Sequence, residues 1–585
     1  MSQLAGRERP LKRLPSILVG CFLVLYSLFF GYRLLAAVLF PYPIEYGEGA
    51  VLYEAYHLSL GDPYYLYKDN ANPPYRAAIY TPLYYYTAAL PAALSGIASF
   101  AGGRAISGLA ALLAGFLIYR AARIQELRVK VGEREQRIRL SRSTALCAAV
   151  TPFATAPVYA WGALYKPDML AVALSLSAIF VIFVYVERGD PRTAPLTLSG
   201  FNRQTAKKLG LNASDIASAD YQRYLAYTGR ATWAALGAGL LCGLAVFTKQ
   251  SALAAPMAIF FFLILRERRL ALYFAVAFAG LTTTLIIIFQ PFSEGQFFTH
   301  IVAYNSQNYE VEWLFTALNF LVGTHPVLLL FSLVYIIGEF RQVSFTAQTV
   351  TLPGIWPMYF LAALLVTFSV GKVGSNLNYY IEILFVSALL SWWLIARLLA
   401  SRPQVPLGSS SFKLPLAGAA LSLMFVQLIL LHHFPLLADG ANTPGPAQWQ
   451  RAEEIAMEVR RLAEAGPMLA EESGWLAAQN LTTDLDDAFV FGQLAKDGQW
   501  SQQKFLQAIR AGRYKSLMLE IAVAEDTSEA ELDQLVRTGN YAPFPGRFSP
   551  QMLTLFRQNF KPEKRIGRTL FLVLDSSKFA TTQLP

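Results

Sequence analysis

Residues 41–82, PYPIEYGEGAVLYEAYHLSLGDPYYLYKDNANPPYRAAIYTP, decide how the rest of the chain is interpreted. The stretch follows an apolar run at 16–40 but is too polar to lie in lipid. Its acidic side chains outnumber its basic ones, Lys68 and Arg76. Its many tyrosines and prolines suit a membrane–water interface, where an aromatic ring is half buried and its hydroxyl stays wet. We therefore expect residues 41–103 to form an external loop at the membrane surface; a solvated acidic loop is the plain alternative.

The composition indicates a membrane protein with many spans. Of the 585 residues, 55% are hydrophobic and only 15% are charged, against about 25% charged in a typical soluble domain. Apolar runs of about 20 residues, the length that crosses a bilayer, recur through the first three quarters of the chain. The net charge of +10 fits basic cytoplasmic loops, so it does not require a nucleic-acid partner. The three cysteines lie in apolar runs and predict neither disulfides nor a metal site.

The distribution of Lys and Arg predicts about eleven transmembrane helices from a cytoplasmic N-terminus. The basic segment 120–142 belongs inside, so 79–100, which contains prolines and a tyrosine cluster, should lie along the outer leaflet and not cross it. The span 251–265 is short for a bilayer, which predicts that the preceding turn at Lys249 is recessed into a cavity. The expected spans are 16–40, 105–122, 144–161, 169–186, 231–248, 251–265, one beginning near 270, 314–338, 352–370, 377–396 and 414–431.

The composition changes near residue 433. We expect a transmembrane domain over 1–433 and a small soluble α/β domain over 434–585 on the outer face. Within it, 448–465 and 502–511 have helical periodicity, and 467–469, 516–523 and 569–574 read as short strands. The fold class is thus an α-helical polytopic membrane protein with a small α/β C-terminal domain.

Three lysines should lie at outer ends of spans, where the positive-inside rule makes them exceptions. Lys166, Lys249 and Lys372 each stand in a polar patch, and a cation in a membrane cavity is costly unless it meets an anion such as a lipid phosphate. Snorkelling to the interface is the alternative for each. In the Gly- and Asn-rich turn after Lys372, the side chains that could bond sugar hydroxyls are Asn376, Asn378 and Tyr379.

Carboxylates should gather on the same side of the membrane. Glu45 and Glu48 lie in the first external loop, and Asp168 follows the third span. Such carboxylates suit general-base chemistry on an acceptor hydroxyl or amine, or a proton relay in a transporter. Asp168 could instead cap the helix that it precedes.

These motifs resemble the C-type glycosyltransferase (GT-C) superfamily, in particular family 39 and aminoarabinose transferase-like bacterial membrane proteins. The likeness covers about residues 15–400, and it is carried by Glu48-Gly49 with Leu52, Ala55 and Gly61, by Ile79-Tyr80-Thr81-Pro82-Leu83-Tyr84-Tyr85-Tyr86, and by Asp168-Met169-Leu170. The superfamily commonly has adjacent Asp and Glu in the first loop, whereas here Gly47 precedes Glu48. Either Glu45 or Glu48 could therefore be the base.

The resemblance implies a polyprenyl-phosphate sugar donor and transfer, with inversion, to a glycan, lipid or protein acceptor on the outer face of the cytoplasmic membrane. Candidates to stabilise the leaving phosphate are Lys372, Lys249, Lys166 and Arg76, and Tyr80 lies in the matching tyrosine segment. The donor is already activated, so no nucleotide or redox cofactor is needed, although a divalent cation could bind at Glu48 and Asp168.

Two other functions fit the same composition. A transporter or lipid flippase would also have many spans and intramembrane acids, but we find no internal repeat of two halves. A non-catalytic scaffold for envelope assembly would use the C-terminal domain for docking.

Overall fold

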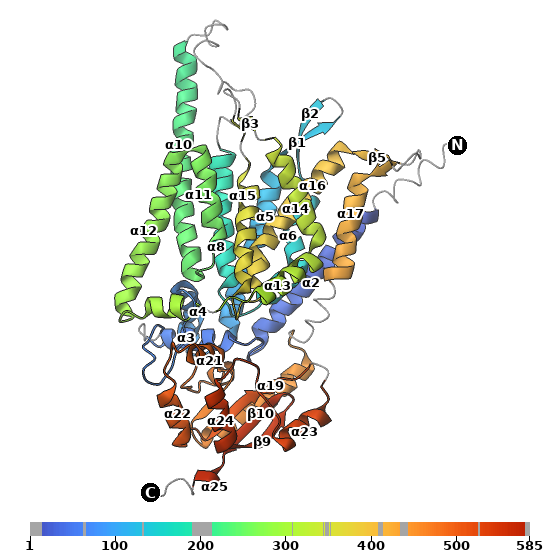
Figure 1. The fold of residues 1–585 in the computed structure, drawn as a ribbon. Coiled ribbons are helices and arrows are strands. Elements are labelled where there is room, and N and C mark those ends of the chain that lie inside the picture. Colours follow the sequence, from blue (N-terminus) through green and yellow to red (C-terminus); the bar gives the residue numbers. More distant parts are fainter. Residues whose placement is uncertain are drawn as a thin grey trace, which may run out of the picture.

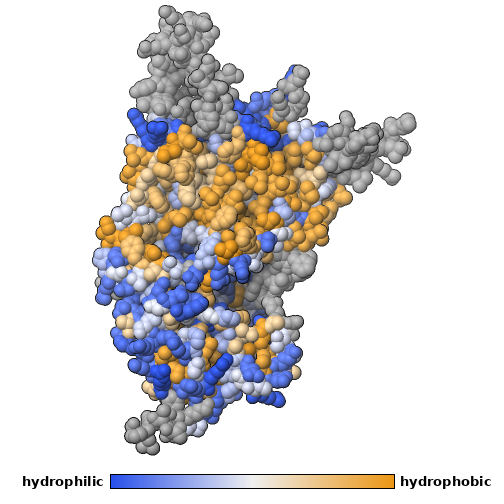
Figure 2. Space-filling model, viewed as in Figure 1, coloured by the Kyte–Doolittle hydropathy of each residue, from blue (hydrophilic) through white to orange (hydrophobic). Residues whose placement is uncertain are grey.

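The computed structural model shows a bundle of helices with a smaller α/β domain at one end (Figure 1). The structure describes residues 14–61, 66–131, 134–189, 213–306, 308–342, 344–345, 350–351, 353–406, 413–432, 443–524 and 527–579. The basic N-terminal tail and the predicted domain boundary at 433/434 lie outside these residues. The space-filling view shows an apolar band across the visible face of the bundle, with polar surface above and below it (Figure 2), as expected of a multi-pass membrane protein.

Six of the described helices are long and apolar enough to cross a membrane. They are α2 (Leu14–Leu39), α5 (Phe100–Ile124), α8 (Asp168–Ile182, continued by a π-turn to Glu187), α10 (Ala213–Thr248), α12 (Arg268–Phe292) and α16 (Ile381–Ser401). Shorter helices complete the bundle: α6 (Arg142–Val150), α7 (Ala156–Trp161), α11 (Ala254–Arg266), α13 (Val311–Thr324), α14 (Pro326–Phe340), α15 (Ile355–Thr367) and α17 (Leu416–Val426).

Two of the expected spans are broken. The run 314–338 divides into α13 and α14, which meet at an angle of 84°, because Pro326 at the start of α14 cannot continue the helix before it. The run 144–161 divides into α6, a 3₁₀ turn and α7, with Pro152 and Pro157 at the breaks. The expected number of about eleven crossings is therefore reached only by adding the short and broken segments to the six long helices.

The first external loop forms two helices at the end of the bundle that faces the α/β domain. These are α3 (Glu48–Ser59) and α4 (Pro82–Ser95), and Figure 1 shows both between the bundle and that domain. The 14 residues of α4 are fewer than a span needs, which agrees with a segment that does not cross. The basic hairpin of β1 (Glu126–Val131) and β2 (Arg134–Arg139) lies at the opposite end.

The α/β domain has a four-stranded sheet in the order β7-β8-β10-β9. Strand β7 (Met468–Ala470) pairs parallel with β8 (Ser516–Glu520), while β10 (Thr569–Leu574) is antiparallel to β8 and to β9 (Phe560–Ile566). The three predicted strands are present. Strand β9 was not predicted, because only its first and last residues are buried and its middle is charged.

The helices of the α/β domain are α19 (Pro446–Glu464), α20 (Gly474–Ala477), α21 (Ala488–Lys496), α22 (Gln503–Arg510), α23 (Glu529–Thr538), α24 (Pro550–Asn559) and α25 (Ser576–Phe579). Short two-stranded pairs elsewhere are β3 (Ser344–Phe345) with β4 (Val350–Thr351) and β5 (Gln404–Pro406) with β6 (Lys413–Pro415).

The external loop and the α/β domain share one hydrophobic core. Tyr75 packs among Phe491, Trp500 and Phe505, and its backbone N–H donates to the carbonyl of Asp484 at 2.7 Å. Helices α3 and α20 approach so closely that a Cβ on Gly49 would lie 2.1 Å from the backbone nitrogen of Gly474. The loop is thus clamped between the bundle and the domain.

This close approach gives a stability prediction. We expect Gly49→Ala to lower the free energy of unfolding by about 1–3 kcal/mol, because overpacking against backbone forces α3 and α20 apart. The control is Gly31→Ala in α2, where a Cβ would meet nothing within 4 Å. Thermal unfolding in detergent measures both, and equal stability of the two variants would contradict the clamp.

Candidate functional site

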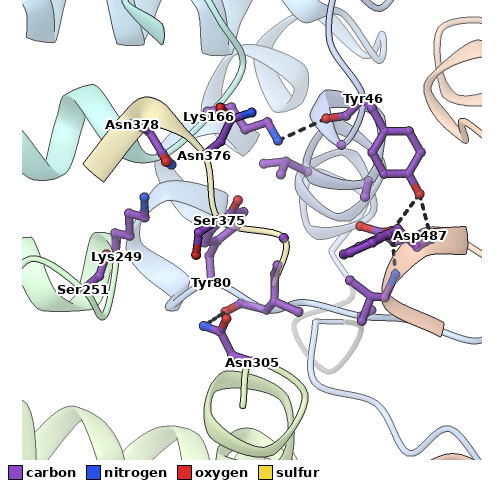
Figure 3. Close-up of a pocket in the computed structure, with 18 of the residues that line it drawn as sticks. Tyr46, Tyr80, Lys166, Lys249, Ser251, Asn305, Ser375, Asn376, Asn378 and Asp487 are labelled. Carbon is purple, nitrogen blue, oxygen red and sulfur yellow. Dashed lines mark hydrogen bonds between the residues drawn. The ribbon is translucent and has the colours of Figure 1, made fainter. Parts of the chain in front are cut away.

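A cavity of about 180 Å³ lies where the loop 41–103, the ends of the bundle helices nearest the α/β domain and that domain meet (Figure 3). The loop contributes one wall, the turns after α10 and α15 contribute another, and Asp487, Phe489 and Val490 come from the α/β domain. The predicted site residues that line it are Glu45, Tyr80, Lys166, Lys249, Lys372, Asn376, Asn378 and Tyr379. Most of the candidates chosen from sequence therefore converge on one cavity.

Glu45 forms an ion pair at the cavity wall. Its Oε2 lies 3.0 Å from Nζ of Lys166, which also donates to the carbonyl of Tyr46 at 3.3 Å. Gly47 makes this possible, because it has φ +87° and a Cβ there would lie 2.8 Å from that Nζ. Burial raises the pKa of Glu45, and Lys166 opposes this rise. Burial alone would lower the pKa of Lys166, but Glu45 outweighs it and the pKa is raised.

Glu48, the other candidate base, is fully buried and lies outside the cavity. Its carboxylate is held by Arg104 of α5, with NH2 to Oε2 at 2.7 Å and Nε to Oε1 at 3.0 Å. It also accepts the backbone N–H of Ile44 at 2.9 Å and of Tyr165 at 2.6 Å. Burial acts to raise the pKa of Glu48, but Arg104 and these amides lower it overall. Glu48 therefore holds together the two segments that carry Glu45 and Lys166.

Asp168 is also engaged. Its Oδ1 accepts from Nζ of Lys249 at 2.5 Å and from Nδ2 of Asn378 at 2.7 Å, and Lys249 lies over the ring of Tyr379 at 5.0 Å. Pro167 occupies the N-cap position of α8 and Asp168 is the first residue of the helix, so Asp168 is not the capping residue. These residues also line a smaller cavity, of about 30 Å³, beside the main one.

Lys372 differs from the other two lysines. Its Nζ donates to the backbone carbonyl of Asn305 at 3.0 Å and to the side-chain oxygen of the same residue, and no carboxylate pairs with it within the part of the chain that the structure describes. Burial lowers the pKa of Lys372 to about 8, and the nearby charge of Lys249 contributes. The turn is held by the amide of Val373, which donates to the carbonyl of Asn308 at 2.9 Å.

Two further candidates have structural contacts. Arg76 does not line the cavity; it donates to the carbonyls of Tyr75 and Thr483, both at 2.9 Å, and lies over the ring of Tyr53. It therefore ties the loop to the α/β domain. Asn376 uses its side chain to cap the short helix that begins at Leu377, at 2.7 Å.

Sequence reasoning missed several lining residues. Tyr46 donates its hydroxyl to Asp487 Oδ1 at 2.8 Å and accepts from the amide of Phe489 at 2.8 Å, which Figure 3 shows as the link between loop and domain. The cavity is also lined by Glu54, Gln250 and Asn305. Gln250 adjoins Lys249 in sequence, but nothing in the sequence pointed to the residues of the α/β domain.

The carboxylates near the cavity do not favour a metal ion. Among the described residues no three His, Cys, Asp or Glu side chains lie close enough together to hold one. Glu48 and Asp168, the expected cation ligands, already hold Arg104 and Lys249. We therefore place no metal on this pair.

Known structures share this fold. ArnT from Cupriavidus metallidurans, a GT-C aminoarabinose transferase, aligns in its apo state with a TM-score of 0.54 and 12% identity, over 95% of this chain and 98% of ArnT. ArnT bound to undecaprenyl phosphate aligns with a TM-score of 0.50 and 11% identity over the same shares. The apo oligosaccharyltransferase of Archaeoglobus fulgidus aligns with a TM-score of 0.48 and 11% identity, over 93% of this chain and 72% of the oligosaccharyltransferase. No family model and no curated protein sequence matches the chain. The chain has the GT-C fold.

The buried pair gives a prediction that separates stability from chemistry. Glu48→Gln should lower the free energy of unfolding by about 3–5 kcal/mol, because it leaves the charge of Arg104 buried without a partner. Unfolding in detergent measures this, with the exposed Glu310→Gln as the control. A Glu48→Gln protein as stable as the parent would show that the pair does not hold the site together.

Proposed function

We propose that this chain is an integral-membrane glycosyltransferase that moves a sugar from a polyprenyl-phosphate donor to an acceptor. The observation that carries the proposal is the cavity itself, which brings the carboxylate of Glu45 together with Lys372, a half-buried lysine that has no carboxylate partner among the described residues. The GT-C fold and the undecaprenyl phosphate bound to ArnT support a lipid-phosphate donor. The basic hairpin at the opposite end of the bundle supports an outer-face site in the cytoplasmic membrane, with a cytoplasmic N-terminus.

The phosphate is assigned to Lys372 and Lys249. The two ammonium groups are close enough that the charge of Lys249 contributes to lowering the pKa of Lys372, so an anion between them would relieve a like-charge repulsion. Lys249 is already balanced by Asp168, which leaves Lys372 as the main charge for the leaving phosphate. Lys372 supplies this charge, so the proposal needs no divalent cation, nucleotide or redox cofactor.

Glu45 is assigned as the general base. It lines the cavity, whereas both oxygens of Glu48 are occupied by Arg104 and backbone amides. Glu45 accepts the proton of the acceptor hydroxyl or amine as that atom attacks the anomeric carbon. A new glycosidic bond forms while the bond from the anomeric carbon to the phosphate oxygen breaks on the opposite face, and the electron pair leaves with the phosphate. Configuration at the anomeric carbon is inverted.

The assignment of the base is tested by Glu45→Gln. We expect its transfer rate to fall about 10²–10⁴-fold, since the variant cannot accept the proton. Thermal stability should also fall, because Lys166 loses its carboxylate partner, but by less than in Glu48→Gln, since the Glu45 side chain is 34% exposed. The assay uses purified protein in detergent, radiolabelled polyprenyl-phosphate sugars and a membrane extract as acceptor, with Glu310→Gln as the control. A folded Glu45→Gln protein with the parent's transfer rate would overturn the assignment.

The phosphate assignment predicts a pH dependence. A lysine with a pKa of about 8 is charged below that pH and loses its charge as the pH rises through it. We therefore expect kcat/KM for the donor to fall above about pH 8, because this ratio reports groups of the free enzyme. Lys372→Arg should extend activity to higher pH, since arginine stays protonated. If kcat/KM falls over the same alkaline pH range in the parent and in Lys372→Arg, the titration belongs to another group.

A further inference from the structure

The cavity wall continues beyond the two lysines in an ordered row. Asn305, which holds Lys372, also donates from Nδ2 to the carbonyl of Ile79 at 3.5 Å. The same carbonyl accepts Nε2 of Gln250 at 2.7 Å. Two residues earlier, the amide of Ala77 donates to both oxygens of Asp486 at 3.1 Å. Lys372 and Gln250 are therefore joined through Asn305 and Ile79, and Ala77, two residues before Ile79, leads to Asp486.

Gln250 presents an unused acceptor to the cavity. Its amide nitrogen donates to the carbonyl of Ile79 and to that of Ile301, at 3.2 Å, which fixes the orientation of the side chain. Its Oε1 is buried and has no hydrogen-bond partner within the described chain. Leaving a buried acceptor without a donor costs about 1–3 kcal/mol.

Glu54 adds a carboxyl to the same cavity. The residue is 1% exposed and lines the cavity. Its carboxyl lies beside Asp486 and Tyr85, and hydrogen bonds with both act on its pKa. A cavity wall that carries a buried carboxyl and an amide oxygen without a protein donor is suited to a ligand that donates hydrogen bonds.

The charge around Glu54 indicates which kind of hydrogen-bond donor the ligand carries. Burial raises the pKa of Glu54, and the neighbouring Asp486 carboxyl raises it further. A carboxyl pair that shares one proton carries one negative charge, and Arg76 lies close enough to act on both members. The group is thus close to neutral, so it favours hydroxyl groups over a second cation.

We propose that Glu54 and Gln250 form a subsite that binds hydroxyl groups of the donor's sugar. This inference rests on the proposed function, because a phosphate at Lys372 places its attached sugar against Gln250 and then Glu54. The opposing possibility is that Glu54 and Asp486 only join α3 to the α/β domain.

The test compares two ligands that differ only in the sugar. Binding of a bare polyprenyl phosphate and of a panel of polyprenyl-phosphate hexoses and pentoses is measured by intrinsic fluorescence in detergent, since Trp161 lines the cavity. The parent should bind at least one sugar-bearing lipid more tightly than the bare lipid. Glu54→Leu should weaken that binding about 10- to 100-fold, the loss expected for hydrogen bonds to a carboxyl, and leave bare-lipid binding unchanged.

A second variant guards against misfolding. Glu54→Gln keeps the shape and removes the repulsion from Asp486, so it should be at least as stable as the parent and show a smaller loss of the same kind. Unchanged binding of both lipids in either folded variant, equal weakening of both, or no preference of the parent for any sugar-bearing lipid would overturn the subsite. A parent that binds neither lipid would instead overturn the proposed function.

Discussion

The buried ion pair between Glu48 and Arg104 is the constraint on which the site depends. Arg104 also donates to the carbonyls of Ala37 and Phe40 at 2.8 and 2.6 Å, so it joins the outer end of α2 to α5. The Glu48 carboxylate accepts hydrogen bonds from the backbone amides of Ile44 and Tyr165. These two residues directly precede Glu45 and Lys166, which form the ion pair at the cavity. A carboxylate and a guanidinium that are buried away from water are stable together only when their remaining hydrogen-bonding positions are also satisfied. Those bonds fix the two chain segments that carry the pair.

The α/β domain is part of the site as well as an appendage. Tyr46, the residue after the proposed base, is held by Asp487 and the amide of Phe489. The guanidinium of Arg547 lies 3.0 Å from the centre of its ring. The base is therefore positioned from the membrane side through Glu48 and from the domain side through Tyr46. Such two-sided support suits a catalytic group, whose geometry must hold within a fraction of an ångström.

Sequence reasoning reached the fold class, the strand at 569–574 and the convergence of the lysines, because these follow from hydropathy and the positive-inside rule. It could not choose between Glu45 and Glu48, since the choice depends on Arg104, which is distant in sequence. A lone arginine within an apolar run does indicate a buried partner, and that signal was available. Gln250 adjoins Lys249, whose turn was expected to line a cavity. Asp487 and Glu54 had no such signal, because only the docking of the α/β domain and the folding of the loop bring them to the cavity.

The three lysines show how pairing divides similar residues into different roles. A buried cation is costly unless an anion neutralises it. Lys166 and Lys249 are neutralised within the protein, by Glu45 and Asp168, so their charges orient carboxylates and add little net field. Among the described residues the Lys372 ammonium bonds the oxygens of Asn305 and no carboxylate, and burial, with the nearby charge of Lys249, lowers its pKa. The site is therefore left with one uncompensated positive charge in the cavity wall, which is the charge that a phosphate monoanion or diester requires.

Gln250 and Glu54 line the same wall and have a different requirement. Their oxygens are suited to uncharged hydrogen-bond donors, such as hydroxyl groups. A sugar attached to a phosphate meets both demands in the same order along one wall.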